Sequence, residues 1–222
     1  MFGVRFVTGI SRLPFSMWLL VFRSGDDAPI DFSLAVHDNE PMAAIATPPS
    51  VLLICGMISA NPSLFDQAVD EMSPLFGPVE IRSDVMAFDF THYYDRQMGS
   101  PLWRQFVSFA NPVTGDALAA AKRATNEFEE RFAQRLQAPG APERPINLDP
   151  GYVDLSKLVL ASCKDFSHRV YLGGGVFGEI TLMFHKDRWD ALPWTFPDYA
   201  SGRYDGFLLA VRARLRQSGG RS

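Results

Sequence analysis

The sequence predicts an α+β fold, in which helices pack against an antiparallel sheet. Three observations support this class: apolar runs of strand length, amphipathic helical segments between them, and proline- and glycine-rich connections. The first six predicted elements match a ferredoxin-like β-α-β-β-α-β core. A C-terminal β-hairpin and a helix are appended to this core. An open doubly wound α/β sheet is the alternative.

Three helices and six strands are expected. The most regular helix is 116–136, because its apolar side chains recur every three or four residues. The run at 149–152, Asp-Pro-Gly-Tyr, is expected to be a turn. The other predicted helices are 61–76 and 204–215, and the predicted strands are 51–57, 79–88, 102–109, 158–162, 168–172 and 177–184.

Composition excludes some functions. The chain has 222 residues and a formal net charge of -4, so it lacks the general basic surface that binds duplex DNA. Cys55 and Cys163 each lie inside an apolar run, VLLICGM and LVLASC, which favours reduced thiols and a cytoplasmic location. The apolar run 13–22 is too short to span a membrane, so no membrane partner is expected.

The N-terminal part is expected to differ from the rest. Residues 1–41 are predicted to be an extension, either disordered or upstream of a true start at Met42. Residues 42–222 are predicted to form a single α+β domain.

Gly173, Gly174 and Gly175 separate two strand-like runs and predict a tight hairpin. If all three form the loop, Arg169 lies opposite Glu179 on one face. The other face is expected to be core and carries Val170, Leu172, Ile180, Leu182 and Phe184.

The pair Arg169 and Glu179 has two interpretations. One is an ordinary cross-strand ion pair on a half-exposed sheet. The other is an anion-binding site, in which Glu179 orients Arg169 toward a phosphate or carboxylate and Lys164 adds a second positive charge.

His168 is the candidate general acid or base, because imidazole titrates near neutral pH. Asp165 is the candidate group that orients it, and Glu179 is a further candidate catalytic carboxylate. The alternative for His168 is an ordinary strand histidine without a catalytic role.

Other residues are candidates for supporting roles. Asp149, Asp165 and Glu179 are the oxygen ligands that a divalent metal cofactor would use, although their spacing matches no metal motif. Asp89 could equally cap a turn, and Thr125 could bond a backbone carbonyl within its helix. In total, four residues are candidates for supporting the site: Asp149, Asp89, Thr125 and Asn126.

Four stretches resemble the prokaryotic domain of unknown function 4416 family: FGPVEIRSDVMAFDFTHYYDRQMG, the run Thr125-Asn126-Glu127, NLDPGYVDLSKLVLASCKDFSHRVYLGGGVFGEITLMF and LPWTFPDY. The resemblance covers about Val51 to Leu215 and implies no established activity. It implies that the family's domain begins near 46–51, which agrees with an extension before it. Cys163 stands where relatives have Ser or Thr, which argues against a required hydroxyl there.

The leading functional hypothesis is a small cytoplasmic enzyme, a hydrolase or transferase, that binds an anionic small molecule such as a nucleotide or a phosphorylated metabolite. One alternative is a non-catalytic binding or assembly protein, for which a homo-oligomer is expected. A second alternative is binding of single-stranded RNA through aromatic and basic side chains.

Overall fold

The computed structural model describes residues 45–91 and 93–219. The contacts between residues gather Ala46–Ser222 into one compact unit. The extension predicted at residues 1–41 lies outside the described residues. In the described part of the chain, no helix has the length and apolar character needed to cross a membrane.

The helices and strands follow one another along the chain in this order: β1 (Val51–Ser59), α1 (Ser63–Phe76), β2 (Val79–Arg82), β3 (Met86–Ala87), α2 (Asp95–Met98), β4 (Trp103–Val113), α3 (Ala117–Arg135), β5 (Asn147–Val153), β6 (Lys157–Ser162), β7 (Val170–Gly173), β8 (Val176–His185), β9 (Arg188–Ala191), α4 (Pro197–Ala200) and α5 (Asp205–Gln217).

Nine strands of the described residues form one antiparallel sheet. Their order is β2-β4-β1-β5-β6-β8-β7, with β3 beside β4 and β9 beside β8. This sheet and its helices confirm the α+β class. The doubly wound alternative is wrong, because that architecture requires mostly parallel strands.

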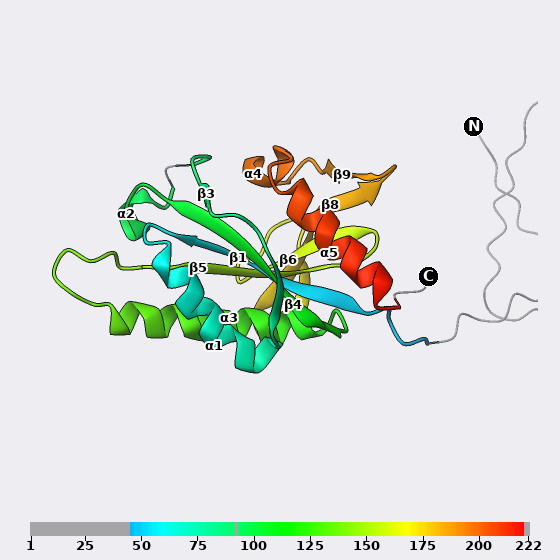
Figure 1. Ribbon diagram of the computed structural model, residues 1–222, viewed down its shortest axis with the longest axis horizontal. Helices are drawn as coiled ribbons and strands as arrows, with labels where there is room; N and C mark the ends of the chain where they lie inside the picture. Colours follow the sequence, from blue (N-terminus) through cyan, green and yellow to red (C-terminus); the bar gives the residue numbers. More distant parts are fainter. Residues whose placement is uncertain (1–44, 92, 220–222) are drawn as a thin grey trace, which may run out of the picture. The chain divides into compact units, whose positions relative to one another are not determined.

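Helices cover both faces of the sheet (Figure 1). Helices α1 and α3 lie on one face, where Phe65 and Phe132 pack against β1 and β4. Helix α5 lies on the other face, where Leu208 and Val211 pack near Phe106. Every residue of β1 is buried, since both of its faces are covered. This explains the continuous apolar run in its sequence.

Strand β5 corrects the predicted turn at 149–152, whereas the strand predicted at 158–162 is confirmed as β6. Strand β5 pairs with β1 from Asn147 to Val153. Pro150 is tolerated because β6 pairs with β5 only beyond it, from Gly151 onward. Gly151 is required by close packing, since a Cβ there would lie 2.6 Å from the Val159 carbonyl oxygen. Strand β9 was also not predicted, and the strand predicted at 79–88 is split into β2 and β3.

The C-terminal hairpin has a shorter loop than expected, because Gly173 pairs with Val176 and the turn is Gly174-Gly175. Both turn glycines have positive φ, 59° and 77°, as a two-residue hairpin turn requires. The predicted core face is wrong for three of its five residues. Strand β7 ends the sheet and a register shift in β8 changes which side chains face inward, so the side chains of Val170, Leu172 and Ile180 are exposed.

Candidate functional site

A cavity of about 700 Å³ is lined by residues on both sides of a fork in the sheet. Strand β5 pairs with β6 only at Gly151–Val153, whereas β6 continues along β8 as far as Ser162. The first half of β5 and the end of β6 therefore diverge. Asp149 from β5 and Ser162 from β6 both line the cavity between them.

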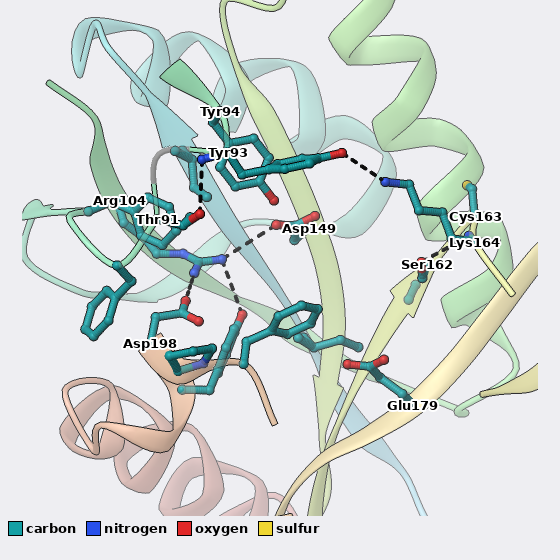
Figure 2. A pocket seen from close by; sticks show the side chains of 18 of the residues that line it. Thr91, Tyr93, Tyr94, Arg104, Asp149, Ser162, Cys163, Lys164, Glu179 and Asp198 are labelled. Carbon is teal, nitrogen blue, oxygen red and sulfur yellow. Dashed lines mark hydrogen bonds and ion pairs between the residues drawn. The ribbon is translucent and has the colours of Figure 1, made fainter. Parts of the chain in front are cut away.

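The cavity lining combines aromatic walls with charged groups (Figure 2). The residues come from β1, β4, α3, β5, β6, β8 and α4, and from the connections before α2, β7 and α4. The aromatic residues are Phe88, Phe90, Tyr93, Tyr94, Phe196 and Tyr199; the basic ones are Arg104, Lys122, Lys164 and Arg169; the acidic ones are Asp149, Glu179 and Asp198.

Arg104 lies at one end of the cavity, and its side chain is almost fully buried. It forms an ion pair with Asp198, and its Nη2 lies 3.6 Å from Asp149 Oδ2. Burial alone would lower the pKa of Arg104, but its interactions with Tyr199 and Asp198 outweigh this effect and raise the pKa. The guanidinium is therefore a fixed cation. Its carbon lies 4.9 Å from the centre of the Phe106 ring, so aromatic faces also stabilise the charge.

The tyrosines beside this ion pair are neutral donors and acceptors. Tyr204 donates its hydroxyl to Asp198 Oδ2 at 3.2 Å, and Arg104 donates to the Tyr199 hydroxyl oxygen at 3.5 Å. Burial raises the pKa of Tyr199 well above its usual value and raises the pKa of Tyr204 to about 12. Neither phenol is ionised at neutral pH.

Helix α3 contributes Lys122 and Asn126 to the same cavity. Lys122 Nζ donates to the Leu148 carbonyl oxygen at 3.0 Å and lies 3.9 Å from Asp149 Oδ1. Asn147 donates to Asp149 Oδ2 at 2.6 Å. Asp149 thus lies between two cations, Lys122 and Arg104, and 28% of its side chain remains exposed.

A partly buried acid, Glu129, extends this network beyond the residues that line the cavity. Glu129 accepts from Arg144 Nη2 at 2.7 Å and from the Leu148 amide at 2.7 Å. Burial raises the pKa of Glu129, although Arg144 opposes the effect. These contacts hold the first half of β5 in place where β6 no longer supports it.

The other end of the cavity is formed by Arg169 and Glu179. Arg169 Nε donates to Glu179 Oε2 at 2.7 Å, which confirms the predicted pairing of the two residues across the hairpin. Arg169 Nη1 donates to Ser162 Oγ at 2.9 Å and to the Lys164 carbonyl oxygen at 2.8 Å. Lys164 Nζ lies 3.5 Å from the Tyr93 hydroxyl.

His168 lies next to this group without lining the cavity. Its Nε2 is 3.0 Å from Glu179 Oε2, and its ring stacks on Trp194 with centroids 5.2 Å apart and planes 7° apart. Glu179, not Asp165, is therefore the carboxylate that contacts His168. Asp165 is exposed and is not among the residues that line the cavity.

The structure brings some of the predicted residues together and separates others. Thr125 donates to the Lys122 carbonyl oxygen within its helix, and Asp89 forms an exposed ion pair with Arg203 at 3.1 Å. Neither residue lines the cavity. The predicted residues that do line it are Asn126, Asp149, Lys164, Arg169 and Glu179.

The structure does not assemble the metal site that the sequence allowed. Within residues 45–91 and 93–219, no group of three or more His, Cys, Asp and Glu side chains could hold a metal ion. Asp149, Asp165 and Glu179 therefore do not form a shared set of ligands.

Three charged residues of the cavity were missed from the sequence: Arg104, Lys122 and Asp198. Two of them carried a signal. Arg104 interrupts an aromatic and β-branched strand, and Lys122 falls on the buried stripe of α3 one residue after Ala121. A charged side chain on a buried face requires a partner, and that requirement indicates a polar site. The short segment around Asp198 gave no such indication.

Comparison with known proteins identifies the family of this chain. Neither the curated proteins nor the solved structures include a match to this chain. A family model, Domain of unknown function (DUF4416), matches residues 49–215, which include every residue that lines the cavity. The chain belongs to the DUF4416 family.

Proposed function

We propose that the cavity at the fork of β5 and β6 binds an anionic small molecule. The observation that carries this proposal is the convergence of four basic side chains, from three different parts of the chain, on one cavity of about 700 Å³. Small-molecule sites typically have volumes of about 300 to 1,000 Å³ and contain a few convergent polar groups.

The distribution of ion pairs indicates which cations serve the ligand. Arg104 is paired with Asp198, and Arg169 with Glu179. Lys122 Nζ lies 3.9 Å from Asp149 Oδ1, its nearest carboxylate oxygen, which is too far for a hydrogen bond. Lys164 forms no ion pair with any described residue. The two lysines therefore supply the positive charge that an incoming phosphate or carboxylate would neutralise.

The aromatic walls favour a ligand that also has an apolar or planar part. Tyr93 and Tyr94 lie edge to face with centroids 5.1 Å apart, and Phe196 lines the cavity from the connection before α4. Aromatic rings of this kind bind flat ligand groups by stacking or edge contacts. A nucleotide or a phosphorylated metabolite has the required combination of a charged and a less polar part.

The reaction that we propose is hydrolysis or group transfer at the bound anion. Asp149 supports this class, because it is a partly exposed carboxylate inside the cavity with a cation on either side. A carboxylate so placed can orient or deprotonate an attacking hydroxyl or water. His168 does not line the cavity, so it would affect the reaction only through its contact with Glu179. The free thiols of Cys55 and Cys163 support a cytoplasmic location.

We also infer that β1, α1, β2, β4, α3 and β5 form a ferredoxin-like core. Their spatial order, β2-β4-β1-β5, and the two intervening helices on one face support this assignment. The strands β6 to β9 and helix α5 then extend the core, and the candidate site lies where the extension begins.

A second candidate function, assembly into homo-oligomers, has its own supporting observation. Strand β7 lies at the end of the sheet and carries Val170, Tyr171 and Leu172, which are 68%, 60% and 42% exposed. An exposed apolar edge strand can pair with a second chain. Light scattering tests it: a dimer that Val170→Lys converts to a monomer supports assembly, and a monomeric wild type rejects it.

A thermal-shift screen tests anion binding. The probes are inorganic phosphate, pyrophosphate, adenosine monophosphate, adenosine triphosphate and citrate, each with and without Mg²⁺. A ligand at about 100 times its Kd stabilises a protein by roughly 2.7 kcal/mol, which corresponds to a rise in Tm of about 5 to 10 °C. We expect at least one probe to produce such a rise in the wild type.

Two variants locate the binding. Lys164→Ala should reduce the rise in Tm, because it removes the unpaired cation of the cavity. Arg188→Ala is the matched control, since Arg188 is an exposed basic residue on β9 outside the cavity. Equal shifts in both variants would place the anion elsewhere, and no shift with any probe would reject the proposed function.

A further inference from the structure

Glu179 has one carboxylate oxygen whose hydrogen-bonding capacity is unused. Its Oε2 accepts from Arg169 Nε at 2.7 Å and lies 3.0 Å from His168 Nε2. Its Oε1 is buried and has no hydrogen-bond partner among the residues that the structure describes. A carboxylate oxygen that is removed from water without a donor is costly, so the site calls for a donor that the protein does not itself supply.

The cavity is where such a donor can arrive. Glu179 is 97% buried by the protein, since its relative exposure is 3%, and it is nevertheless one of the residues that line the cavity. Figure 2 shows its carboxylate directed toward the interior, on the same side as Ser162 and Lys164. The two neighbouring donors, Arg169 and His168, are both bound to the other oxygen.

We infer that Glu179 Oε1 accepts a hydrogen bond from a hydroxyl or amino group of the ligand. This inference rests on the proposed function and specifies its ligand class. Arg169 binds the same carboxylate through Nε and donates through Nη1 to the Lys164 carbonyl oxygen, so Glu179 lies at the end of the cavity that Lys164 lines, and the anion and the donor are close together in the ligand. The ligand is therefore a phosphate or a carboxylate that carries a hydroxyl or amine on a neighbouring carbon.

Glu179 Oε1 would also let the site discriminate between ligands with and without a hydroxyl or amino group. A site built to receive a hydroxyl or amine rejects an analogue without that group, because the buried acceptor is then left unpaired. Glu179 is accordingly a specificity-determining residue. Lys122 and Lys164 supply affinity for the anion whether or not the ligand carries the donor.

Two matched pairs of probes test the inference by isothermal titration calorimetry. The phosphate pair is 2-hydroxypropyl phosphate and propyl phosphate, and the carboxylate pair is mandelate and phenylacetate. Within each pair the main difference is the hydroxyl near the anion. We expect the wild type to bind the hydroxyl-bearing member of at least one pair about tenfold more tightly. The pair that shows the preference identifies the anion as phosphate or carboxylate.

Two variants complete the test. Glu179→Gln can present an amide N–H in place of Oε1, so it should reduce the tenfold preference to less than about twofold. His168→Ala is the matched control, because it removes a partner of Oε2 and leaves Oε1 in place, so it should retain the preference. Circular dichroism and the Tm of each variant show whether it is folded. If Glu179→Gln is not folded, the inference is decided by the wild-type preference together with its retention in His168→Ala.

Several outcomes would overturn the inference. Equal binding of both members of each pair by the wild type, or an unchanged preference in Glu179→Gln, rejects the role of Glu179 and leaves the proposed function standing. The same conclusion holds if neither pair binds while inorganic phosphate or another screened anion does. If no anion binds at all, the proposed function fails and this inference fails with it.

Discussion

Arg104 and Asp198 are 94 residues apart in the sequence and form a buried ion pair at one end of the cavity. Arg104 comes from β4 and Asp198 from α4, so the pair joins the sheet to the C-terminal segment. The side chains are only 4% and 6% exposed. Their positions thus define one end of the candidate site and hold α4 against it.

Removing one member of this pair should destabilise the protein strongly. Asp198→Ala leaves the Arg104 guanidinium buried without its main counter-charge, and such losses typically cost about 3 to 5 kcal/mol. We expect the free energy of unfolding, measured by urea denaturation, to fall by this amount. The control is Asp89→Ala, which breaks the exposed pair with Arg203 and should cost less than about 1 kcal/mol. Similar losses in the two variants would contradict the importance of burial.

The two cysteines should differ sharply in reactivity. Cys55 is buried in β1, and burial raises its pKa, so it has almost no reactive thiolate at pH 8. Cys163 is exposed and lines the cavity. We expect iodoacetamide to modify only Cys163 in the folded protein, as measured by mass spectrometry of peptides. Cys163→Ser should abolish the rapid labelling, and both thiols should react in urea. Rapid labelling of Cys55 in the native protein would contradict the packing of β1.

Asp154 should make stability depend on pH in acid. It lies in the turn between β5 and β6, where it accepts from the Ser156 amide at 2.6 Å and the Lys157 amide at 2.7 Å. Burial alone would raise the pKa of Asp154, but these bonds and the Lys157 ammonium outweigh it and lower the pKa below 3.8. The unfolded chain therefore holds more protons between the two pKa values, and stability rises with pH in that window.

The consequence can be measured with Asp154→Asn. At pH 7 this variant should be less stable than the wild type by about 1 to 2 kcal/mol, because hydrogen bonds to a charged acceptor are lost. The difference should shrink as the pH falls below 3.8 and the wild-type carboxylate is protonated. Asp165→Asn, an exposed control, should change stability by less than about 0.5 kcal/mol at any pH. A deficit in Asp154→Asn that stays constant down to pH 2.5 would disprove the linkage.

The hairpin turn gives a test of local conformation. Gly174 has a positive φ of 59°, and a Cβ there would lie 2.4 Å from Arg123 Nη1. Gly174→Val should lower the free energy of unfolding by about 1 to 3 kcal/mol, because a β-branched residue is strained at positive φ. Gly174→Asn should cost less, since asparagine tolerates this conformation and Arg123 is a flexible neighbour. Equal losses in urea denaturation would show that the contact with Arg123, rather than φ, limits this position.

The sequence was sufficient for elements whose periodicity reflects burial. Helix α3 was predicted within one residue at each end, since its apolar stripe faces a continuous layer of core. Strand β5 was missed because its Asp-Pro-Gly run has the composition of a turn. Its stability comes from pairing with β1, which is about 90 residues away, and no local pattern records such a partner.

In the candidate site, too, local contacts were predictable from the sequence and contacts between distant segments were not. Arg169 and Glu179 were paired correctly because a hairpin brings neighbours in sequence together. Asp165 was assigned to His168 on sequence proximity alone, yet the direction of the chain after β6 leaves it exposed while Glu179 reaches the histidine across the hairpin. Arg104 and Asp198 were missed as a pair because only the tertiary fold brings β4 and α4 together.

Anomalous diffraction can show whether the cavity binds anions through Lys122 and Lys164. Crystals of the wild type and of the double variant Lys122→Met, Lys164→Met would be soaked in tungstate, a tetrahedral dianion. We expect a strong tungsten peak inside the wild-type cavity, in contact with Lys122 or Lys164, and no such peak in the double variant. Peaks found only beside exposed arginines such as Arg188, or a cavity peak that both proteins retain, would contradict it.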